Sequence, residues 1–236
     1  MFTESAELYD LIYSTIRDYG AEAEQVDVRL RDLKPNCRTI LDVACGTGEH
    51  ARLLEARFGY KVDGLDLSPA FVSIAHRKLP GRLFVVGDMA AFHLERRYDA
   101  VICLGSSIGY LLSLETVQRA LECFRAHLSD DGVLIVEPWL SPEQLESGYR
   151  STRTVESPTV KVVREQTTEL VGRVSRLRFD YTIESHGRTR RTTELHELGL
   201  FTVAELQSTF AAAGLQARHD PYGLNGRGLF VASIAA

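Results

Sequence analysis

The sequence has no long hydrophobic run and few cysteines. No apolar stretch approaches the ~20 residues of a membrane-spanning helix, and Met1–Ser5 lacks the basic region and apolar stretch of a secretion signal. The four cysteines are widely scattered and form no C-x-x-C pair, which favours reduced thiols over disulfides. These absences predict a cytoplasmic protein with no membrane partner, and no metal site is predicted.

Positive charge is also scarce. The chain carries 27 Lys and Arg residues against 32 Asp and Glu, a formal net charge of −5. Binding a phosphate backbone requires a basic face, so this balance argues against nucleic acid as a partner, although a local basic patch would suit a small phosphorylated ligand. With 236 residues, 44% of them hydrophobic, the chain suits one α/β domain with a smaller inserted layer.

Ile40–Gly48 is the most informative segment, an apolar run that contains Asp42 and breaks into a glycine turn. Gly46 and Gly48 allow a ligand to approach the backbone closely, and the following helix directs its free N–H groups at the same point. The Asp42 carboxylate can accept hydrogen bonds from a ligand with donor groups. The segment predicts an S-adenosylmethionine (SAM) site, in which Asp42 and the backbone around Ala44, Gly46 and Gly48 hold the methionine end.

Strand and helix patterns alternate over the first part of the chain. The expected strands are Arg38–Val43, Lys61–Leu65, Leu83–Val86, Ala100–Leu104 and Val133–Val136. The expected helices are Leu8–Ile16, Ala21–Leu33, a helix from Gly48 that stops at Gly59, one from Ser68 to Pro80, and one from Leu114 that ends at Gly132. Such alternation is typical of a doubly wound, mostly parallel sheet with helices on both faces.

After Trp139 the pattern changes to alternating β-branched and charged residues. Turn signals at Gly172 and Gly187 predict a three-stranded antiparallel meander, with strands Val160–Val163, Arg173–Ile183 and Thr189–Leu200. Thr202–Glu205 matches a capping box and starts a helix that ends at Gly214, and two final strands follow, near Gln216–His219 and Leu229–Ile234. The prediction is one domain over 1–236, with a seven-stranded main sheet and a small sheet inserted after its fifth strand, at about 150–200.

Acidic residues follow three successive predicted strands. In an open α/β sheet, ligands bind outside the carboxyl ends of the strands, where Asp42, Asp66 and Asp88 would lie. SAM offers matching donors, so we expect Asp66 to accept from the ribose hydroxyls and Asp88 from the adenine amine, with Met89 against the ring. A single Asp after a strand often only caps the next helix, but three of them beside a glycine turn favour a ligand.

A dinucleotide site is the competing interpretation of the turn. Gly46–Ala51 fits the G-x-G-x-x-A fingerprint, and Asp66 lies twenty residues after Gly46, where the ribose ligand of NAD would be. A dinucleotide pyrophosphate would pack against the turn, however, and the Asp42 carboxylate would repel it. Gly87–Asp88 also has no part in that fingerprint, so the sequence favours SAM.

Several segments together resemble one known family. They are Ala6–Asp10, Leu41–Gly48, Gly87–Met89, Ser106–Tyr110, Val136–Trp139 and Gly226–Phe230. Over essentially the whole chain the sequence resembles the dTDP-amino-sugar N,N-dimethyltransferases of desosamine and mycaminose biosynthesis. The resemblance implies a Rossmann-like class I SAM methyltransferase fold, an N-terminal helical lid over 1–36, and dimethylation of a dTDP-3-amino-dideoxyhexose in deoxysugar or antibiotic biosynthesis.

The strand-end argument and the resemblance define three sets of site residues. We expect cofactor binding by Tyr19, Asp42, Ala44, Cys45, Gly46, Gly48, Asp66, Leu67, Gly87, Asp88, Met89 and Leu104. We expect substrate binding by Ser106, Ser107, Trp139, Tyr149, Arg176, Arg178 and Arg227. The candidate catalytic residues are Tyr110 and Tyr9.

The arginines and serines have alternative interpretations. Arg227 stands between two glycines, where it suits bidentate binding of a pyrophosphate or a solvated turn. Ser106 and Ser107 follow the fourth strand and either bind phosphate or sugar or cap the next turn. Arg176 and Arg178 alternate with apolar residues, so they share one strand face, either over the nucleotide or in solvent.

The tyrosine roles depend on the resemblance. Tyr19 matches a family segment whose hydroxyl reaches the cofactor or sugar, and Tyr110 stands where some members carry a histidine near the amine. Tyr9 and Tyr13 belong either to a lid or to helix packing. Family members have a tyrosine near the start of the chain, whereas Phe2 here has no hydroxyl, a departure that weakens any scheme with a base at the N-terminus.

Methyl transfer is an in-line displacement by a neutral amine. We expect most of the rate to come from holding nitrogen and methyl in line at ~3 Å, with Tyr110 orienting the amine or relaying its proton and Tyr9 as a weaker candidate. Two alternatives stay open: a methyltransferase of this fold for another small amine or hydroxyl, such as glycine, and a non-catalytic SAM-binding protein. The amine position, C3 or C4, and the formation of a homodimer also stay open.

Overall fold

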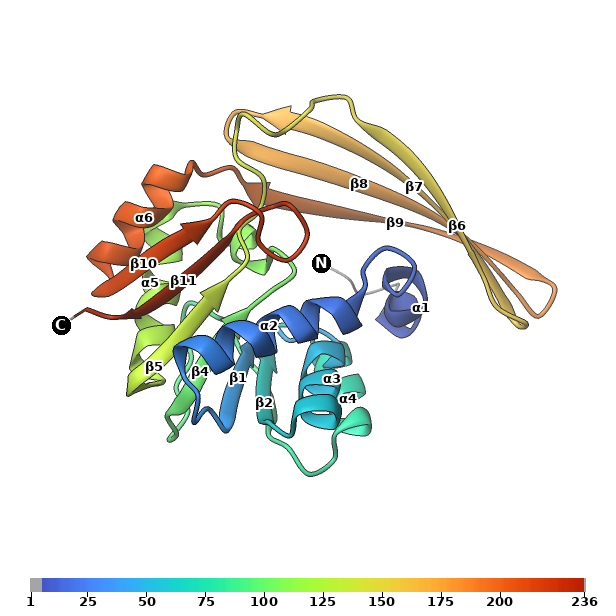
Figure 1. Cartoon of the computed structure of the whole chain (residues 1–236). Coiled ribbons are helices and arrows are strands. Elements are labelled where there is room, and N and C mark those ends of the chain that lie inside the picture. Colours follow the sequence, from blue (N-terminus) through green and yellow to red (C-terminus); the bar gives the residue numbers. More distant parts are fainter. Residues whose placement is uncertain (1–5, 236) are drawn as a thin grey trace.

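The computed structural model describes residues 6–235, arranged as a main sheet flanked by helices and a second sheet that arches over one edge of it (Figure 1). The prediction for Phe2, and the first five residues of the expected lid, lie outside the described residues. Within them, no helix is long and apolar enough to cross a membrane. The four cysteines are free thiols, three of them buried.

The main sheet contains seven strands, as predicted. They are β1 (Thr39–Val43), β2 (Lys61–Asp66), β3 (Phe84–Val86), β4 (Tyr98–Cys103), β5 (Leu128–Val136), β10 (Leu215–Asp220) and β11 (Leu229–Ile234). Their spatial order is β10-β11-β5-β4-β1-β2-β3, with β1 to β5 paired in parallel and β11 antiparallel to both of its neighbours. Because β1 lies between β2 and β4, the chain reverses its winding direction at β1, and ligands bind at such a switch point.

Helices cover both faces of the main sheet. The longer ones are α2 (Tyr19–Leu33), α3 (Glu49–Phe58), α4 (Pro69–Lys78), α5 (Leu114–Ala126) and α6 (Val203–Ala212). Adjacent residues of β1 face opposite clusters: Ile40 packs with residues of α2, α3 and α4, and Leu41 packs with residues of α5 and α6. Both residues are fully buried, which explains why the central strands are continuous apolar runs.

The inserted sheet has four antiparallel strands, one more than predicted. In order they are β6 (Arg150–Glu156), β7 (Val160–Val171), β8 (Val174–Ser185) and β9 (Arg188–Gly199). The sequence shows only the start of β7, and β6 was missed because Val155 is the one buried residue of that edge strand. The turns at Gly172 and Gly187 are confirmed, each glycine having a positive φ.

Two helices differ most from their predicted extents. The expected helix over Leu8–Ile16 is a 3₁₀ turn, η1 (Ala6–Leu8), followed by the short α1 (Tyr9–Tyr13). The helix expected to end at Gly132 ends at Ala126, because Leu128 already pairs with Tyr98 in the sheet. The capping box at Thr202 is present.

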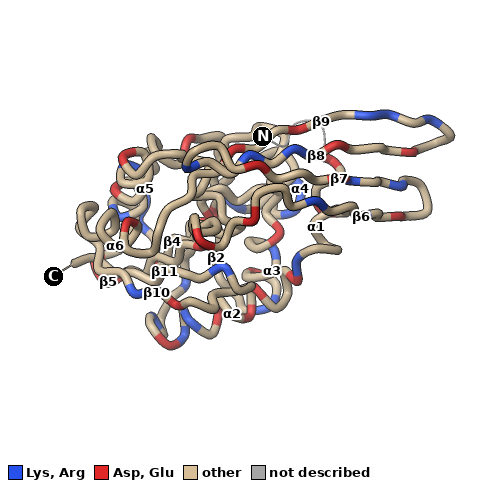
Figure 2. The backbone as a smooth tube through the Cα atoms, turned by 90° about the horizontal axis from the view of Figure 1, so that it is seen from above, with Lys and Arg blue, Asp and Glu red and all other residues tan. Residues whose placement is uncertain are grey.

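Charges of both signs are interspersed along most of the chain, as Figure 2 shows. A basic stretch occurs at the start of β9, where Arg188, Arg190 and Arg191 are exposed.

Candidate active site

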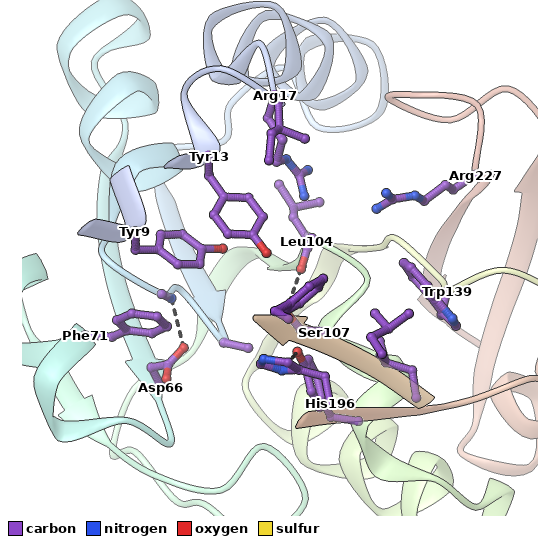
Figure 3. A pocket seen from close by; sticks show the side chains of 18 of the residues that line it. Tyr9, Tyr13, Arg17, Asp66, Phe71, Leu104, Ser107, Trp139, His196 and Arg227 are labelled. Carbon is purple, nitrogen blue, oxygen red and sulfur yellow. Dashed lines mark hydrogen bonds between the residues drawn. The ribbon is translucent and has the colours of Figure 1, made fainter. Parts of the chain in front are cut away.

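A cavity of about 870 Å³ lies between the carboxyl ends of β1, β2 and β4, the N-terminal helical segment, the inner face of the inserted sheet and the loop before β11. This volume is near the upper end of the range for ligand pockets, about 300–1,000 Å³. In Figure 3, Tyr9, Tyr13 and Asp66 lie on one side of the cavity and Trp139 and Arg227 on the other. The two ends of the cavity are therefore lined by chemically different side chains.

The glycine turn after β1 forms one wall of the cavity. Ala44 and Gly46 both have a φ of +57°, and nothing lies within 4 Å of where a Cβ of Gly46 would be. Gly48 plays a packing role instead: its φ is +74°, an added Cβ would meet the Cβ of Ala75 at 3.0 Å, and it does not line the cavity. The turn thus exposes the backbone at Gly46 while Gly48 lets α3 approach α4.

Asp42 is a buried carboxylate at the end of β1. It is 2% exposed, and among the residues that the structure describes its Oδ2 has no hydrogen-bond partner. Burial, with the nearby Asp66 charge, raises the pKa of Asp42 to about 8. An ion left unpaired in such a place is costly, so this oxygen suits a cationic donor such as the ammonium group of SAM.

Asp66 at the end of β2 both organises the turn and faces the cavity. Its Oδ2 accepts from the Gly46 N–H at 2.9 Å, and its Oδ1 accepts from the Ser68 N–H at 2.8 Å. Burial nevertheless raises the pKa of Asp66. Asp66 therefore stabilises the loop before α4, and it also lines the cavity. Each of its oxygens keeps a further lone pair for a ligand hydroxyl.

The third predicted carboxylate, Asp88, lies after β3 and also lines the cavity, together with Met89. Its Oδ1 accepts from the Ala90 N–H at 2.9 Å, a local turn contact. This arrangement leaves the Asp88 side chain at the same edge of the sheet as Asp42 and Asp66, because the parallel strands β1, β2 and β3 end side by side.

The N-terminal segment covers the cavity with aromatic rings. Tyr9 stacks on Tyr13 with ring centroids 4.2 Å apart and contacts Phe71 edge-on at 4.9 Å. Burial raises the pKa of both tyrosines. On the same short helix, Asp10 is bound by Lys78 of α4 at 2.7 Å and by the Thr47 hydroxyl at 2.5 Å. α1 is thereby fastened over the glycine turn.

Glu137, at the end of β5, is a fully buried carboxylate that the sequence argument did not single out. It accepts from the Gly105 N–H at 2.7 Å, from Arg17 at 3.2 Å and from Asn225 at 2.8 Å. Arg17 in turn donates to Glu22 at 2.7 Å. Burial opposes the charge of Arg17, but these two glutamates raise its pKa overall.

Arg227 lies beside this group of charges, at the opposite end of the cavity from Asp66 (Figure 3). Its guanidinium donates to the Ser106 hydroxyl at 3.3 Å and stacks 5.0 Å from the centroid of the Trp139 ring. Burial lowers the pKa of Arg227. The stacked, half-buried guanidinium is suited to bind an anion bidentately.

Tyr110 lies on η2 (Ser107–Leu111), a 3₁₀ helix after β4, and it also lines the cavity. Its hydroxyl is 2.8 Å from Nδ1 of His196, on β9 of the inserted sheet. His196 was not among the predicted site residues, because nothing in its local pattern distinguishes it from other residues of an alternating strand. The pair connects the main sheet and the inserted sheet at the cavity wall.

Most of the predicted site residues lie around this cavity. Every predicted cofactor residue except Gly48 lines it, as do the two candidate catalytic tyrosines and four of the substrate residues, Ser107, Trp139, Tyr149 and Arg227. Ser106 is buried behind Arg227 and has a φ of +61°. The cavity wall also includes residues that the sequence argument missed: Arg17, Thr47, Arg153, Arg164, Gln166 and His196.

The structure does not bring Arg176 and Arg178 into the cavity. On β8, Leu177 and Phe179 line it, so the intervening arginines point to the opposite face of the strand. There Arg176 pairs with Glu197 and Arg178 with Asp180, both at exposed positions. Of the two interpretations of this strand, the structure favours the solvent-facing one.

Comparisons with known proteins extend over nearly the whole chain. A family model described as a methyltransferase domain matches residues 40–132. The dTDP-3-amino-3,6-dideoxy-alpha-D-glucopyranose N,N-dimethyltransferase of Streptomyces fradiae is 41% identical over 229 residues, which cover 96% of this chain and 89% of that one. The dTDP-4-amino-2,3,4,6-tetradeoxy-D-glucose N,N-dimethyltransferase of Saccharopolyspora spinosa is 34% identical, over 97% of this chain and 92% of that one.

A solved structure of similar architecture contains the cofactor. SAM-bound CalS10, an amino pentose methyltransferase from Micromonospora echinaspora, is 33% identical and has a TM-score of 0.87, with 100% of this chain and 98% of that chain covered. The similarity therefore includes the inserted sheet as well as the main sheet.

Proposed function

The chain belongs to the family of dTDP-amino-sugar N,N-dimethyltransferases, and from this premise we propose that it transfers two methyl groups from SAM to the amine of a dTDP-amino sugar. One observation carries the proposal: a single cavity joins the stacked guanidinium of Arg227 to Asp42, whose buried Oδ2 has no hydrogen-bond partner among the residues described. The carboxylate suits the ammonium group of the cofactor, and the guanidinium suits a pyrophosphate.

The residues at the β1–β3 end of the cavity fit SAM. Asp42 would bind the amino-acid ammonium, beside the exposed backbone of Gly46. Asp66 would accept from the ribose hydroxyls, and Asp88 with Met89 would bind the adenine. When bound, the cofactor supplies an electrophilic methyl group on a cationic sulfur, whose departure as a neutral thioether needs no acid.

The other end of the cavity suits the nucleotide sugar. Arg227, held by Ser106 and Trp139, would bind the pyrophosphate, with Ser107 and Tyr149 as further ligands. Arg153 and Gln166 on the inner face of the inserted sheet are also available to a phosphate or a sugar hydroxyl. The outer-face residues Arg176 and Arg178 have no role in this proposal.

The chain contributes to the reaction mainly through position. Closing the two substrates between Tyr9, Tyr13 and the inserted sheet would hold the amine nitrogen in line with the methyl group, an effect that is worth up to about 7–11 kcal/mol of the barrier. The Tyr110 hydroxyl would accept a hydrogen bond from the amine and direct its lone pair. A second methylation requires exchange of the spent cofactor while the monomethylated sugar rotates or rebinds.

Mass spectrometry of reaction mixtures tests the proposal. Purified protein is incubated with SAM and, in separate reactions, with dTDP-3-amino sugars, dTDP-4-amino sugars and glycine. We expect one class of nucleotide sugar to gain the mass of two methyl groups in place of two hydrogens. Methylation of glycine alone would replace the proposal with the small-amine alternative, and cofactor binding without any product would favour a non-catalytic protein.

A further inference from the structure

We propose that His196 is a positioning residue that acts through Tyr110: its Nδ1 accepts the Tyr110 hydroxyl proton, so that the Tyr110 oxygen can take a proton from the substrate ammonium. The proposal rests on the proposed function, since it concerns the amine that is methylated. It makes Tyr110 and His196 a proton relay that runs from the cavity into the inserted sheet, where the Glu194 carboxylate lies near the imidazole.

The relay joins a partly exposed tyrosine at the cavity to two buried residues of the inserted sheet. The Tyr110 hydroxyl lies 2.8 Å from His196 Nδ1, and His196 Nε2 lies 3.7 Å from the nearer carboxylate oxygen of Glu194. His196 is 1% exposed and Glu194 is 4% exposed. Phe179, whose ring centroid is 5.1 Å from that of His196, packs against the imidazole and fixes its orientation.

These positions favour one direction for the Tyr110–His196 hydrogen bond. A carboxylate near Nε2 favours a proton on that nitrogen, which leaves Nδ1 as the acceptor. The Tyr110 O–H then donates to Nδ1, and its oxygen lone pairs are left for a donor in the cavity. In this arrangement Tyr110 accepts from the substrate amine and does not donate to it, as attack by the nitrogen lone pair requires.

The proton balance is simple. An N–H bond of the substrate ammonium breaks as its proton passes to the Tyr110 oxygen, and the Tyr110 O–H bond breaks as its own proton passes to His196 Nδ1. The result is a neutral amine, a neutral tyrosine and an imidazolium near the Glu194 carboxylate. The imidazolium returns its proton to water before the second methylation.

Among the described residues, titratable and charged groups of several elements face the Tyr110–His196 pair. Glu194 on β9 and Arg164 on β7 act on His196. Tyr13 on α1, Tyr181 on β8, Glu194 and Asp66 on β2 act on Tyr110. Burial lowers the pKa of His196, and Arg164 acts in the same direction, while Glu194 opposes them. The lowered pKa favours the neutral imidazole, which is the form that accepts a proton.

Removing the proton acceptor while keeping the hydrogen bond gives the sharpest test. In His196→Asn an amide oxygen can still accept from Tyr110 but cannot take its proton. We expect kcat/KM near pH 7 to fall roughly 100-fold, the lower end of what general acid–base catalysis contributes. The loss should shrink as the pH rises above the pKa of the substrate ammonium, because the free amine needs no relay, and the dissociation constant for SAM should not change.

Two further variants keep the test decisive. Tyr110→Phe should show the same pH-dependent loss, and the double variant should be no slower than Tyr110→Phe, since both changes break one relay. His127→Asn, at a buried histidine outside the cavity, controls for the loss of a buried imidazole and should leave the shape of the pH profile unchanged. If His196→Asn is too unstable to assay, Tyr110→Phe alone supplies the profile.

Two results would overturn the relay. A loss that is equal at all pH values would mean that His196 only supports the fold of the inserted sheet. If the unaltered protein adds no methyl group to any dTDP-amino sugar, the proposed function itself fails and the relay fails with it, so the two failures are told apart by the wild-type reaction.

Discussion

The Asp66 carboxylate accepts the backbone N–H of Gly46 at 2.9 Å, so the end of β2 holds the glycine turn that follows β1. The contact joins the two signals that the sequence analysis treated separately, the turn and the second strand-end aspartate. Asp66 therefore has two roles: it shapes the wall of the cavity, and its oxygens offer lone pairs to a ligand that binds there.

Replacing Asp66 should therefore weaken cofactor binding more than it weakens the fold. In Asp66→Asn, one acceptor oxygen becomes a donor that opposes the Gly46 N–H or a ribose hydroxyl. We expect SAM affinity, measured by titration calorimetry, to fall about 10- to 100-fold, the value of one to two hydrogen bonds to a charged group. Asp220→Asn, at a half-exposed carboxylate paired with Arg29, is the matched control and should bind normally.

Asp42 should make cofactor binding depend on pH. In the free protein its pKa is raised to about 8, so at pH 7 the carboxyl is mostly protonated, whereas pairing with an ammonium group favours the carboxylate. Binding should therefore release a proton, and affinity should rise as the pH approaches about 8 and then level off. Calorimetry at pH 7 in buffers of different ionisation enthalpy measures that proton. Equal binding heats in all buffers would mean that Asp42 does not change its ionisation.

Replacing Arg227 should weaken the binding of the nucleotide sugar and leave the binding of the cofactor unchanged. In Arg227→Ala the pyrophosphate would lose a bidentate partner, so we expect KM for the sugar to rise at least about 10-fold with the SAM dissociation constant unchanged. Arg176→Ala removes the same kind of side chain from the outer face of the inserted sheet and should leave KM unchanged. Steady-state kinetics of the two variants, side by side, compare the cavity with the outer face of the inserted sheet. A higher KM in the Arg176 variant would favour a nucleotide on the outer face.

The fastening of α1 should control how long the cofactor stays bound. Asp10 joins α1 to Lys78 of α4 and to Thr47 of the glycine turn. Asp10→Asn would weaken the ion pair and let α1 open more often, so we expect SAM to dissociate several-fold faster, consistent with about 1 kcal/mol for a partly exposed pair. Stopped-flow displacement measures this rate, and Glu7→Gln, at an exposed pair with Arg77, is the control.

Sequence patterns predicted the main sheet well because its central strands are buried on both faces. Ile40 and Leu41 belong to opposite clusters, and such doubly buried strands stand out as apolar runs. The edge strand β6 carries one buried residue, Val155, and left no comparable signal. The helix predicted over Leu8–Ile16 was too long, because Ile16 follows Tyr13 at helical spacing but packs against the inserted sheet after α1 has ended at Tyr13.

The site residues, too, include some that local patterns predict and others that depend on contacts between distant segments. Asp42, Asp66 and Asp88 were predicted because parallel strands end at one edge, so their proximity follows from local patterns. Contacts between distant segments could not be predicted from local patterns. Glu137 contacts Arg17, 120 residues away in the sequence, and Tyr110 contacts His196, 86 residues away. For Arg176 and Arg178, the alternation identified a shared face, but only the packing of the inserted sheet shows which face meets the cavity.

A crystal structure of the protein with S-adenosylhomocysteine and a dTDP-amino sugar would locate both substrates in one experiment. We expect the adenosine at Asp66 and Asp88, the pyrophosphate on Arg227, and the sugar nitrogen within hydrogen-bond reach of the Tyr110 hydroxyl. A nucleotide bound on the outer face at Arg176 and Arg178, or a sugar nitrogen directed away from the cofactor sulfur, would show that the proposed binding mode is wrong.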